Sequence, residues 1–362
     1  MLPKVLSRWS TTKPTPATGA DTAHPTPAPP AEAPTGAAPT PTPAPPPVAA
    51  PLFGGDADIS GEVEAGADIR RLLRTELQEL EQGLDAADRR GDALALFDRL
   101  SKSGEKSVRQ PPAAAQRALE MMRRPDVAIP DLVRLVEQDP SLAQALLRHA
   151  NSSLYASAGG AQVVSLTDAI RRVGTQGLRS VVLASMVEGM LCRPGTAFDA
   201  MVKQTWEHMV RTAPLARGIA PAFGVVPDEA FTVALLHDVG KLVLFDRIGT
   251  LRTELRRDLA LAPTLVSRML RTLHEPLGGA AALRWGLGRS AAGVIASHHR
   301  RAEPLAPSPH AECVHVAERL DLALVRGEEI DLPAWWADGR LQTPREGVEP
   351  HVARVAALRA TD

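Results

Sequence analysis

Prolines divide the sequence after residue 110 into segments that each carry the apolar spacing of a helix. Proline fixes φ and lacks a backbone N–H, so it is tolerated in the first turn of a helix but disrupts the interior. No segment shows the strict apolar–polar alternation that is typical of a strand. The sequence therefore predicts an all-α fold class, with helices that begin or end near the prolines at positions 125, 130, 140, 227, 263 and 276.

Capping residues place individual helix ends within this pattern. A short helix is expected from residue 131 to residue 138, and the next one begins with Asp139 and Pro140. An aspartate followed by proline is a typical N-cap and first-turn pair. Two further helices are expected to start at residues 167–170 and 175–178, where threonine and aspartate or glutamine precede apolar residues.

The N-terminal segment differs sharply in composition from the rest. Fourteen of the 32 prolines lie between Pro14 and Pro51, in a tract of proline, alanine and threonine. Such a tract can neither form regular backbone hydrogen bonds nor bury a core, so residues 1–55 are predicted to be a disordered arm. We expect no signal peptide and no membrane span, because the chain has neither an apolar leader nor a run of about 18 apolar residues.

Residues 56–110 are predicted to form a helical pair followed by a linker. Apolar residues of the first helix repeat at steps of three and four, and charged residues fill its other faces. Gly91 marks the turn before a second apolar stripe. We expect this region to pack on the neighbouring domain or to mediate a weak dimer. The two stripes consist of Leu73, Leu77, Leu80, Leu84 and Ala87, and of Leu94, Leu96, Phe97 and Leu100.

Charge and cysteine content exclude some classes of protein. The chain has 41 lysines and arginines against 42 aspartates and glutamates, which gives a formal net charge of −1. This balance provides no global attraction to nucleic acid, so no DNA partner is expected. Two cysteines are too few for a disulfide framework or a four-thiolate zinc site, and they fit a reducing, cytoplasmic location.

An apolar segment, residues 231–236, runs directly into the adjacent pair His237 and Asp238. A buried carboxylate needs a partner, because burying it alone costs several kcal/mol. One candidate partner is a divalent metal, which imidazole and carboxylate both ligate. The alternative is a hydrogen-bonded pair that only ties helices together. Gly240, two residues on, is expected to supply the irregularity that would let both side chains face one ion.

Six segments occur in a fixed order along residues 111–325. They are IPDLVRLVEQDPSLAQALLRHANSSLY, SLTDAIRRVGTQGLRSVVLAS, WEHMVRTAPLARGIA, AFTVALLHDVGKLVL, HEPLGGAAALRWGL and ASHHR. Together they resemble the HDOD domain, a bacterial signalling relative of the HD phosphohydrolases. The resemblance implies two packed helical subdomains and a role in bacterial signal transduction, in which most such domains are regarded as output or scaffold modules rather than enzymes. Residues 326–362 would then form a C-terminal extension.

The resemblance to the wider HD superfamily also implies a set of metal ligands. In that superfamily a first histidine, a His-Asp doublet and a late aspartate hold the metal. His208, His237 and Asp238 match the first three positions. The chain departs from the pattern at the late position, where Glu318 stands, and Asp321 follows one turn later as a candidate substitute.

A second metal position is implied by three further histidines. His274, His298 and His299 match positions that hold a second metal in the HD-GYP phosphodiesterases, which cleave cyclic dinucleotides. The GYP string of those enzymes is absent, because residues 300–304 read RRAEP. Lys241 is a candidate for neutralising a phosphate oxygen. The implied cofactor is a divalent ion such as zinc, manganese, iron or magnesium.

Two functions remain open at this point. The first hypothesis is a bacterial signal-transduction protein whose HDOD-like domain binds a partner protein or a nucleotide without turnover. The alternative is a metal-dependent phosphohydrolase or phosphodiesterase in which His237, Asp238 and Lys241 take part in catalysis. A cyclic dinucleotide is one ligand that the resemblance implies. Trp335 and Trp336, near the C-terminus, are expected to cap the core.

Overall fold

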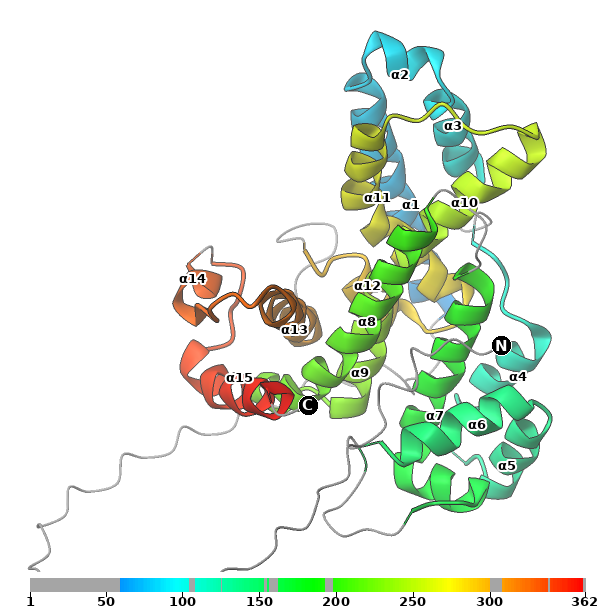
Figure 1. The fold of residues 1–362 in the computed structure, drawn as a ribbon. Coiled ribbons are helices and arrows are strands. Elements are labelled where there is room, and N and C mark those ends of the chain that lie inside the picture. Colours follow the sequence, from blue (N-terminus) through cyan, green and yellow to red (C-terminus); the bar gives the residue numbers. More distant parts are fainter. Residues whose placement is uncertain are drawn as a thin grey trace, which may run out of the picture.

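The computed structural model describes residues 59–103, 108–124, 126–152, 155, 162–192, 198–299, 308–337 and 339–360. Every regular element in these ranges is helical, which confirms the predicted all-α fold class (Figure 1). The predicted disordered arm, residues 1–55, lies outside the described residues. None of the described helices combines the length and the hydropathy that crossing a membrane requires.

The first part of the fold packs three shorter helices around one long helix. These helices are α4 (Ala113–Met121), α5 (Ile129–Glu137), α6 (Pro140–Ala150) and α7 (Leu166–Leu191). α4, α5 and α6 all contact α7 (Figure 1). Gly174 interrupts α7 with a φ of 69°, a conformation that favours glycine. The kink separates two helical segments, and the second begins where a start at residues 175–178 is predicted.

The predicted cap of α6 is confirmed. The side chain of Asp139 accepts hydrogen bonds from the backbone N–H of Ser141, at 2.9 Å, and of Leu142, at 3.2 Å. These bonds satisfy N–H groups that have no partner within the helix. Pro140 occupies the first turn, where its missing N–H has no cost.

The second part of the fold contains the segments that carry the candidate ligands. Its helices are α8 (Asp199–Ile219), α9 (Pro227–Leu236), α10 (Val239–Leu255), α11 (Pro263–Arg284), α12 (Arg289–Ile295) and α13 (Pro309–Arg326), with the 3-10 helix η3 (Ala220–Phe223) after α8. α8 packs against both α9 and α13, and α10 packs along α11. Distant segments of the chain are thereby brought side by side.

The N-terminal helical region packs on this second part. It comprises α1 (Ile59–Gln82), α2 (Ala86–Arg90) and α3 (Ala93–Ser103). α1 lies against α11 and α12, and its buried leucines belong to the common core. Ala87 is exposed and belongs to α2, which has no buried residue, so the apolar stripe is one residue shorter than predicted. The domain boundaries inferred from the sequence stay predictions.

One predicted helix boundary is wrong. Pro276 lies inside α11, which continues unbroken to Arg284. A proline in a helix interior removes one backbone hydrogen bond and crowds the preceding turn. Here α11 is packed by α10, α1 and α12, and the residues on either side of Pro276 are buried. We attribute the continuous helix to this packing, which local sequence preference does not include.

The C-terminal extension folds back onto α8 and α13. It contains α14 (Leu332–Trp336) and α15 (Arg345–Ala360). Trp335 is buried, and the guanidinium of Arg319 lies 5.3 Å from the centre of its ring. Trp336 donates a hydrogen bond from Nε1 to the carbonyl of Thr343, at 2.8 Å. Trp335 is therefore part of the core and Trp336 packs against it, as predicted, and Trp336 also fixes the loop between the two helices.

Candidate metal centre

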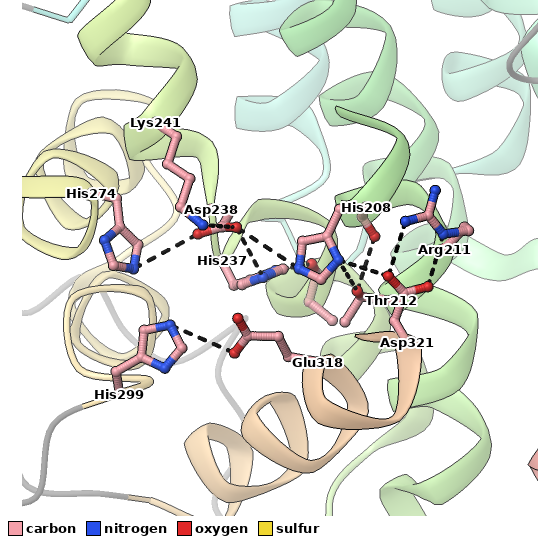
Figure 2. A network of polar contacts seen from close by, with 11 residues as sticks. His208, Arg211, Thr212, His237, Asp238, Lys241, His274, His299, Glu318 and Asp321 are labelled. Atoms are coloured by element: carbon pink, nitrogen blue, oxygen red, sulfur yellow. Dashed lines mark hydrogen bonds and ion pairs between the residues drawn. The ribbon is translucent and has the colours of Figure 1, made fainter. Parts of the chain in front are cut away.

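The His-Asp doublet stands at a break between two helices. α9 ends at Leu236 and α10 begins at Val239, so His237 and Asp238 lie at the junction. Neighbouring residues within an unbroken helix point about 100° apart. The break lets both side chains face the same space (Figure 2). The irregularity is therefore at the doublet itself and not, as expected, at Gly240.

Gly240 instead permits close packing between α10 and α11. A Cβ atom on Gly240 would lie 1.8 Å from the carbonyl oxygen of His274 and 2.6 Å from the backbone nitrogen of Gly278. Only a residue without a side chain lets two backbones approach this closely. Because this approach carries His274 toward Asp238, a glycine outside the ligand set shapes the centre.

Four of the predicted ligands form a first cluster. His208 comes from α8, His237 and Asp238 from the junction, and Glu318 from α13. One potential ligand atom from each residue lies within 4.8 Å of the others. Asp238 Oδ2 is 3.8 Å from His208 Nε2 and 3.6 Å from His237 Nε2. This spacing is compatible with a shared ion, because metal–nitrogen and metal–oxygen bonds are about 2.0–2.2 Å long.

The other three predicted ligands, His274, His298 and His299, form a second cluster whose ligand atoms also lie within 4.8 Å of one another. Asp238 connects the two clusters, because its Oδ1 is 3.7 Å from His274 Nε2 while its Oδ2 faces the first cluster (Figure 2). Glu318 makes a similar link, since its Oε2 lies 3.6 Å from His299 Nε2. All seven predicted ligands therefore meet in one region.

Hydrogen bonds from Nδ1 orient two of the histidines. His237 Nδ1 lies 2.7 Å from the carbonyl of Ala234, and His298 Nδ1 lies 2.8 Å from the carbonyl of Ile295. A carbonyl can only accept, so each Nδ1 carries the proton and each Nε2 keeps its lone pair. This arrangement is the usual one for imidazoles that ligate a metal through Nε2.

Asp321 supports His208 instead of acting as a ligand. Its Oδ2 accepts a hydrogen bond from His208 Nδ1 at 2.7 Å, and Arg211 donates to both of its oxygens, at 2.9 and 3.1 Å (Figure 2). Burial raises the pKa of Asp321, but the hydrogen bonds from His208 and Arg211 hold it below its usual value. The candidate substitution by Asp321 at the late position is therefore not observed: Glu318 joins the ligand groups formed by the described residues, and Asp321 does not.

Burial keeps four imidazoles of the centre, those of His237, His274, His298 and His299, neutral. It lowers the pKa of His237 and of His274 to about 4, and that of His299 to about 2. The pKa of His298 also lies well below its usual value, because the ring is buried and other histidines surround it. Neutral imidazole is the form that binds a cation, so these side chains are ready to ligate at neutral pH.

The two acids of the centre differ in charge. Burial opposes the ionisation of Asp238, but the neighbouring His237 and Lys241 hold its pKa well below the usual value, and Lys241 Nζ lies 2.5 Å from its Oδ2. Burial and the charge of Asp238 raise the pKa of Glu318 to about 8. A divalent cation favours the ionised form of Glu318, so loading the centre at neutral pH would release a proton.

Several buried polar atoms of the centre have no hydrogen-bond partner among the described residues. Buried polar atoms without partners are rare in folded proteins, because each costs about 1–3 kcal/mol. A cation placed among these atoms would compensate for their lost hydration, so the donor set fits a bound metal. The atoms are His237 Nε2, Asp238 Oδ1, His274 Nε2, His298 Nε2 and Glu318 Oε2.

Two further side chains lie at the centre that were not among the residues predicted from the sequence. His315 forms a third potential ligand group with His299 and Glu318, again within 4.8 Å. It precedes Glu318 by three residues on α13, so both residues lie on one helix face. This spacing is visible in the sequence and could have identified His315 as a candidate ligand. Glu275 accepts a hydrogen bond from the backbone N–H of His299 at 2.8 Å. Nothing in the local pattern distinguishes Glu275 from a surface acid.

A cleft of about 580 Å³ adjoins the centre. Its volume is in the range of ligand pockets, about 300–1,000 Å³. Two candidate ligands, His274 and His299, line it together with Lys241. The described residues that line the cleft include no acid, so its wall favours an anionic ligand. The other lining residues are Met201, Gln204, Thr205, Ser267, Leu270, Arg271 and Arg340.

Comparison with known sequences assigns the class. The sequence profile of the HDOD domain matches residues 108–301, which is more than half of the chain. The chain therefore belongs to the HDOD domain family, as its sequence segments predict. No curated protein is significantly similar to the chain. The predicted bounds of 111–325 extend further toward the C-terminus than the matched residues.

Solved structures share this fold. Two come from Shewanella amazonensis. The first has a name that proposes a phosphohydrolase; it is 21% identical, with a TM-score of 0.53, and the match covers 72% of this chain and 93% of that chain. The second has a name that proposes a metal-dependent phosphohydrolase; it is 17% identical, with a TM-score of 0.51, and the match covers 72% of this chain and 99% of that chain. An HDOD domain protein from Geobacter sulfurreducens is 23% identical, with a TM-score of 0.48 and coverage of 77% and 88%. At these identities the likeness to the two Shewanella amazonensis structures concerns the fold alone.

Replacing Asp321 with asparagine should weaken metal binding by about 10- to 100-fold without abolishing it, as is usual for partners of metal-ligating histidines. Asparagine can offer its NH₂ to His208 Nδ1, which would favour the wrong tautomer. Affinity is measured by titrating zinc or manganese into chelator-treated protein. Asp98→Asn, which alters an exposed carboxylate on α3, is the matched control. Equal affinities in both variants would contradict the role given to Asp321.

Proposed function

We propose that this HDOD protein is a metal-dependent phosphohydrolase that acts on a phosphate ester bound in the cleft. The observation that carries the proposal is the position of Asp238, whose two oxygens face two separate groups of buried imidazoles. A carboxylate in this position can bridge two cations. Pairs of metal ions a few ångströms apart are typical of phosphate-ester hydrolysis.

The donor set supports a transition metal. Imidazoles outnumber carboxylates in both clusters taken together, and imidazole suits zinc and iron, whereas magnesium and manganese are better suited by oxygen ligands. Zinc and iron are therefore favoured over magnesium and manganese among the ions that the resemblance implies.

The basic wall of the cleft supports a phosphate ester as the ligand. Lys241 lines the cleft and lies beside Asp238, so its ammonium group can contact a phosphate oxygen next to the metal ligands. Two arginines, Arg271 and Arg340, line the same cleft. Cyclic dinucleotides and other nucleotides belong to this chemical class.

Different residues of the chain would have different roles in hydrolysis. Bound metal ions would supply a deprotonated water as nucleophile and neutralise charge on the phosphate. Asp238 and Glu318 would fix the separation of the two ion positions, and Asp321 would keep His208 aimed at the first of them. Lys241 would hold the phosphate oxygen that faces the cleft. Attack of this water on phosphorus would break the bond from phosphorus to the ester oxygen, which would leave with a proton taken from solvent.

A second candidate function is binding without turnover, in which the same centre recognises a phosphorylated ligand and the domain passes the signal to a partner protein. The presence of Glu318 at the late position favours this candidate, because its longer side chain alters the geometry that aspartate would give. Both candidate functions use the metal centre and the cleft. They differ only in whether the bound ligand is hydrolysed.

Metal content and hydrolysis, measured on the same preparation, test the proposal. Chelator-treated protein is reloaded with zinc, manganese or ferrous iron and assayed with bis(p-nitrophenyl) phosphate and with cyclic dinucleotides. We expect about two ions per chain and hydrolysis that requires them. Stoichiometric metal without hydrolysis of any substrate would favour the second candidate. Protein that takes up no metal would contradict both.

A further inference from the structure

One wall of the cleft comes from outside the matched HDOD region. Arg340 belongs to the loop between α14 and α15, yet it lines the same cleft as His274, His299 and Lys241. The family profile ends at residue 301, so the family match assigns no role to this loop. Arg340 reaches the cleft because the C-terminal extension folds back over α13 (Figure 1).

The loop that carries Arg340 is held by a buried carboxylate. Glu312 of α13 is 6% exposed and accepts hydrogen bonds from the backbone N–H of Gln342, at 3.0 Å, and of Thr343, at 2.9 Å. A buried carboxylate that bonds two successive N–H groups fixes the backbone between them. Gly339 makes the preceding turn with a φ of 68°, which favours glycine. The position of Arg340 is therefore defined by the fold.

The positive charges on the wall come from three separate elements. Lys241 is on α10 beside Asp238, Arg271 is on α11 three residues before His274, and Arg340 is on the C-terminal loop. Lys241 lies next to the candidate metal ligand Asp238 and can contact a phosphate there. The two arginines provide further positive charge on the walls, and no described lining residue is acidic. Two guanidinium groups on the walls, away from the position of Lys241, can contact a second phosphate group.

We infer that Arg340 and Arg271 form a second anion subsite, which selects organic phosphates that carry two separate phosphate groups. The inference rests on the proposed function, which puts the first phosphate at the metal ligands and Lys241. A guanidinium group binds phosphate through two parallel hydrogen bonds. Met201 and Leu270 line the cleft as well and offer apolar surface to the organic part between the phosphates. Nucleoside bisphosphates and linear dinucleotides with a terminal phosphate have this chemistry.

Calorimetric binding of two matched probes tests the subsite. AMP carries one phosphate group and adenosine 3′,5′-bisphosphate carries two. For the metal-loaded full chain we expect tighter binding of the bisphosphate. Arg340→Gln should weaken bisphosphate binding by about 10- to 100-fold, the usual loss for a charged hydrogen-bonding partner, and should leave AMP binding within about twofold. Arg326→Gln, which alters an exposed arginine at the end of α13, is the matched control and should change neither affinity.

A second variant separates the charge of Arg340 from its position. Glu312→Gln keeps Arg340 but removes one of the two acceptors that hold the loop, so the bisphosphate should bind less tightly than to the wild type and more tightly than to Arg340→Gln. Metal content and the thermal transition are measured in every variant, so that loss of the fold is recognised.

Two results would overturn the inference. One is wild-type protein that binds the bisphosphate no more tightly than AMP. The other is an Arg340→Gln variant in which both probes weaken equally or neither weakens. Neither result bears on the hydrolysis of bis(p-nitrophenyl) phosphate, which carries a single phosphate group. Failure of the subsite is therefore distinguishable from failure of the proposed function.

Discussion

Replacing Asp238 with asparagine should leave less than one metal ion per chain and reduce the hydrolysis of bis(p-nitrophenyl) phosphate by at least about 1,000-fold, or about 4 kcal/mol in the barrier. The reason is that both oxygens of Asp238 face imidazole groups, at 3.6–3.8 Å. A neutral carboxamide has only one oxygen acceptor and carries no charge to balance two cations. Among the described residues Glu318 also links the two groups, with its Oε2 3.6 Å from His299 Nε2, but the contacts of Asp238 use both of its oxygens.

The matched control is Asp246→Asn on α10, the helix that follows Asp238. The side chain of Asp246 is 8% exposed and accepts hydrogen bonds from Arg109 at 2.7 Å and Arg247 at 2.6 Å. Its replacement should lower stability, because it weakens two partly buried ion pairs, but it should leave metal content unchanged. Elemental analysis and the hydrolysis assay are performed on both variants. Asp238→Asn protein with the full metal complement would contradict the bridging role.

The helical fold follows from local signals wherever those signals act within one segment. Asp139 and Pro140 determine the start of α6 through contacts no more than three residues away, so the sequence is sufficient there. Pro276 is a position at which local signals do not predict the structure. Its local preference is to end a helix, but the packing of α11 on α10, α1 and α12 outweighs that preference. Such packing depends on residues that are distant in the sequence.

The candidate ligands were predictable because the pattern of histidines resembles a known family, whereas the roles of their supporting residues were not. Glu318 and Asp321 are three residues apart on α13, and both are acids near the late position. Which one joins the candidate ligand group depends on the rotation of α13 against α8, where His208 and Arg211 form hydrogen bonds with Asp321. That rotation is determined by tertiary packing, so the spacing of residues along one helix cannot predict it.

The position of Arg340 at the cleft could not be predicted from the sequence either. It stands in a loop without a recognisable motif, in a segment beyond the family match. Its place at the cleft results from the hydrogen bonds of Glu312 with Gln342 and Thr343, about 30 residues apart in the chain. Sequence alone indicates a C-terminal extension, but the wall of a cleft is defined only when that extension is folded against α13.

Replacing Gly240 with alanine should destabilise the protein by about 3 kcal/mol or more and should also weaken metal binding, although Gly240 is not a ligand. The added Cβ would lie 1.8 Å from the carbonyl oxygen of His274 and 2.6 Å from the backbone nitrogen of Gly278. Both are backbone atoms, so a change of side-chain rotamer cannot relieve the overlap. α10 and α11 must separate, and His274 then moves away from Asp238.

The matched control is Gly189→Ala in α7, where an added Cβ meets no atom within 4 Å. Alanine favours the helix by about 0.5–1 kcal/mol over glycine, so this variant should be as stable as the wild type or slightly more stable. Urea denaturation of chelator-treated protein measures both effects without a contribution from bound metal. If Gly240→Ala unfolded at the urea concentration of the wild type, the backbone contact between α10 and α11 would not position His274. If it unfolded early but bound metal normally, the contact would contribute to stability alone, and the geometry of the centre would have to be held by the other ligand-bearing helices.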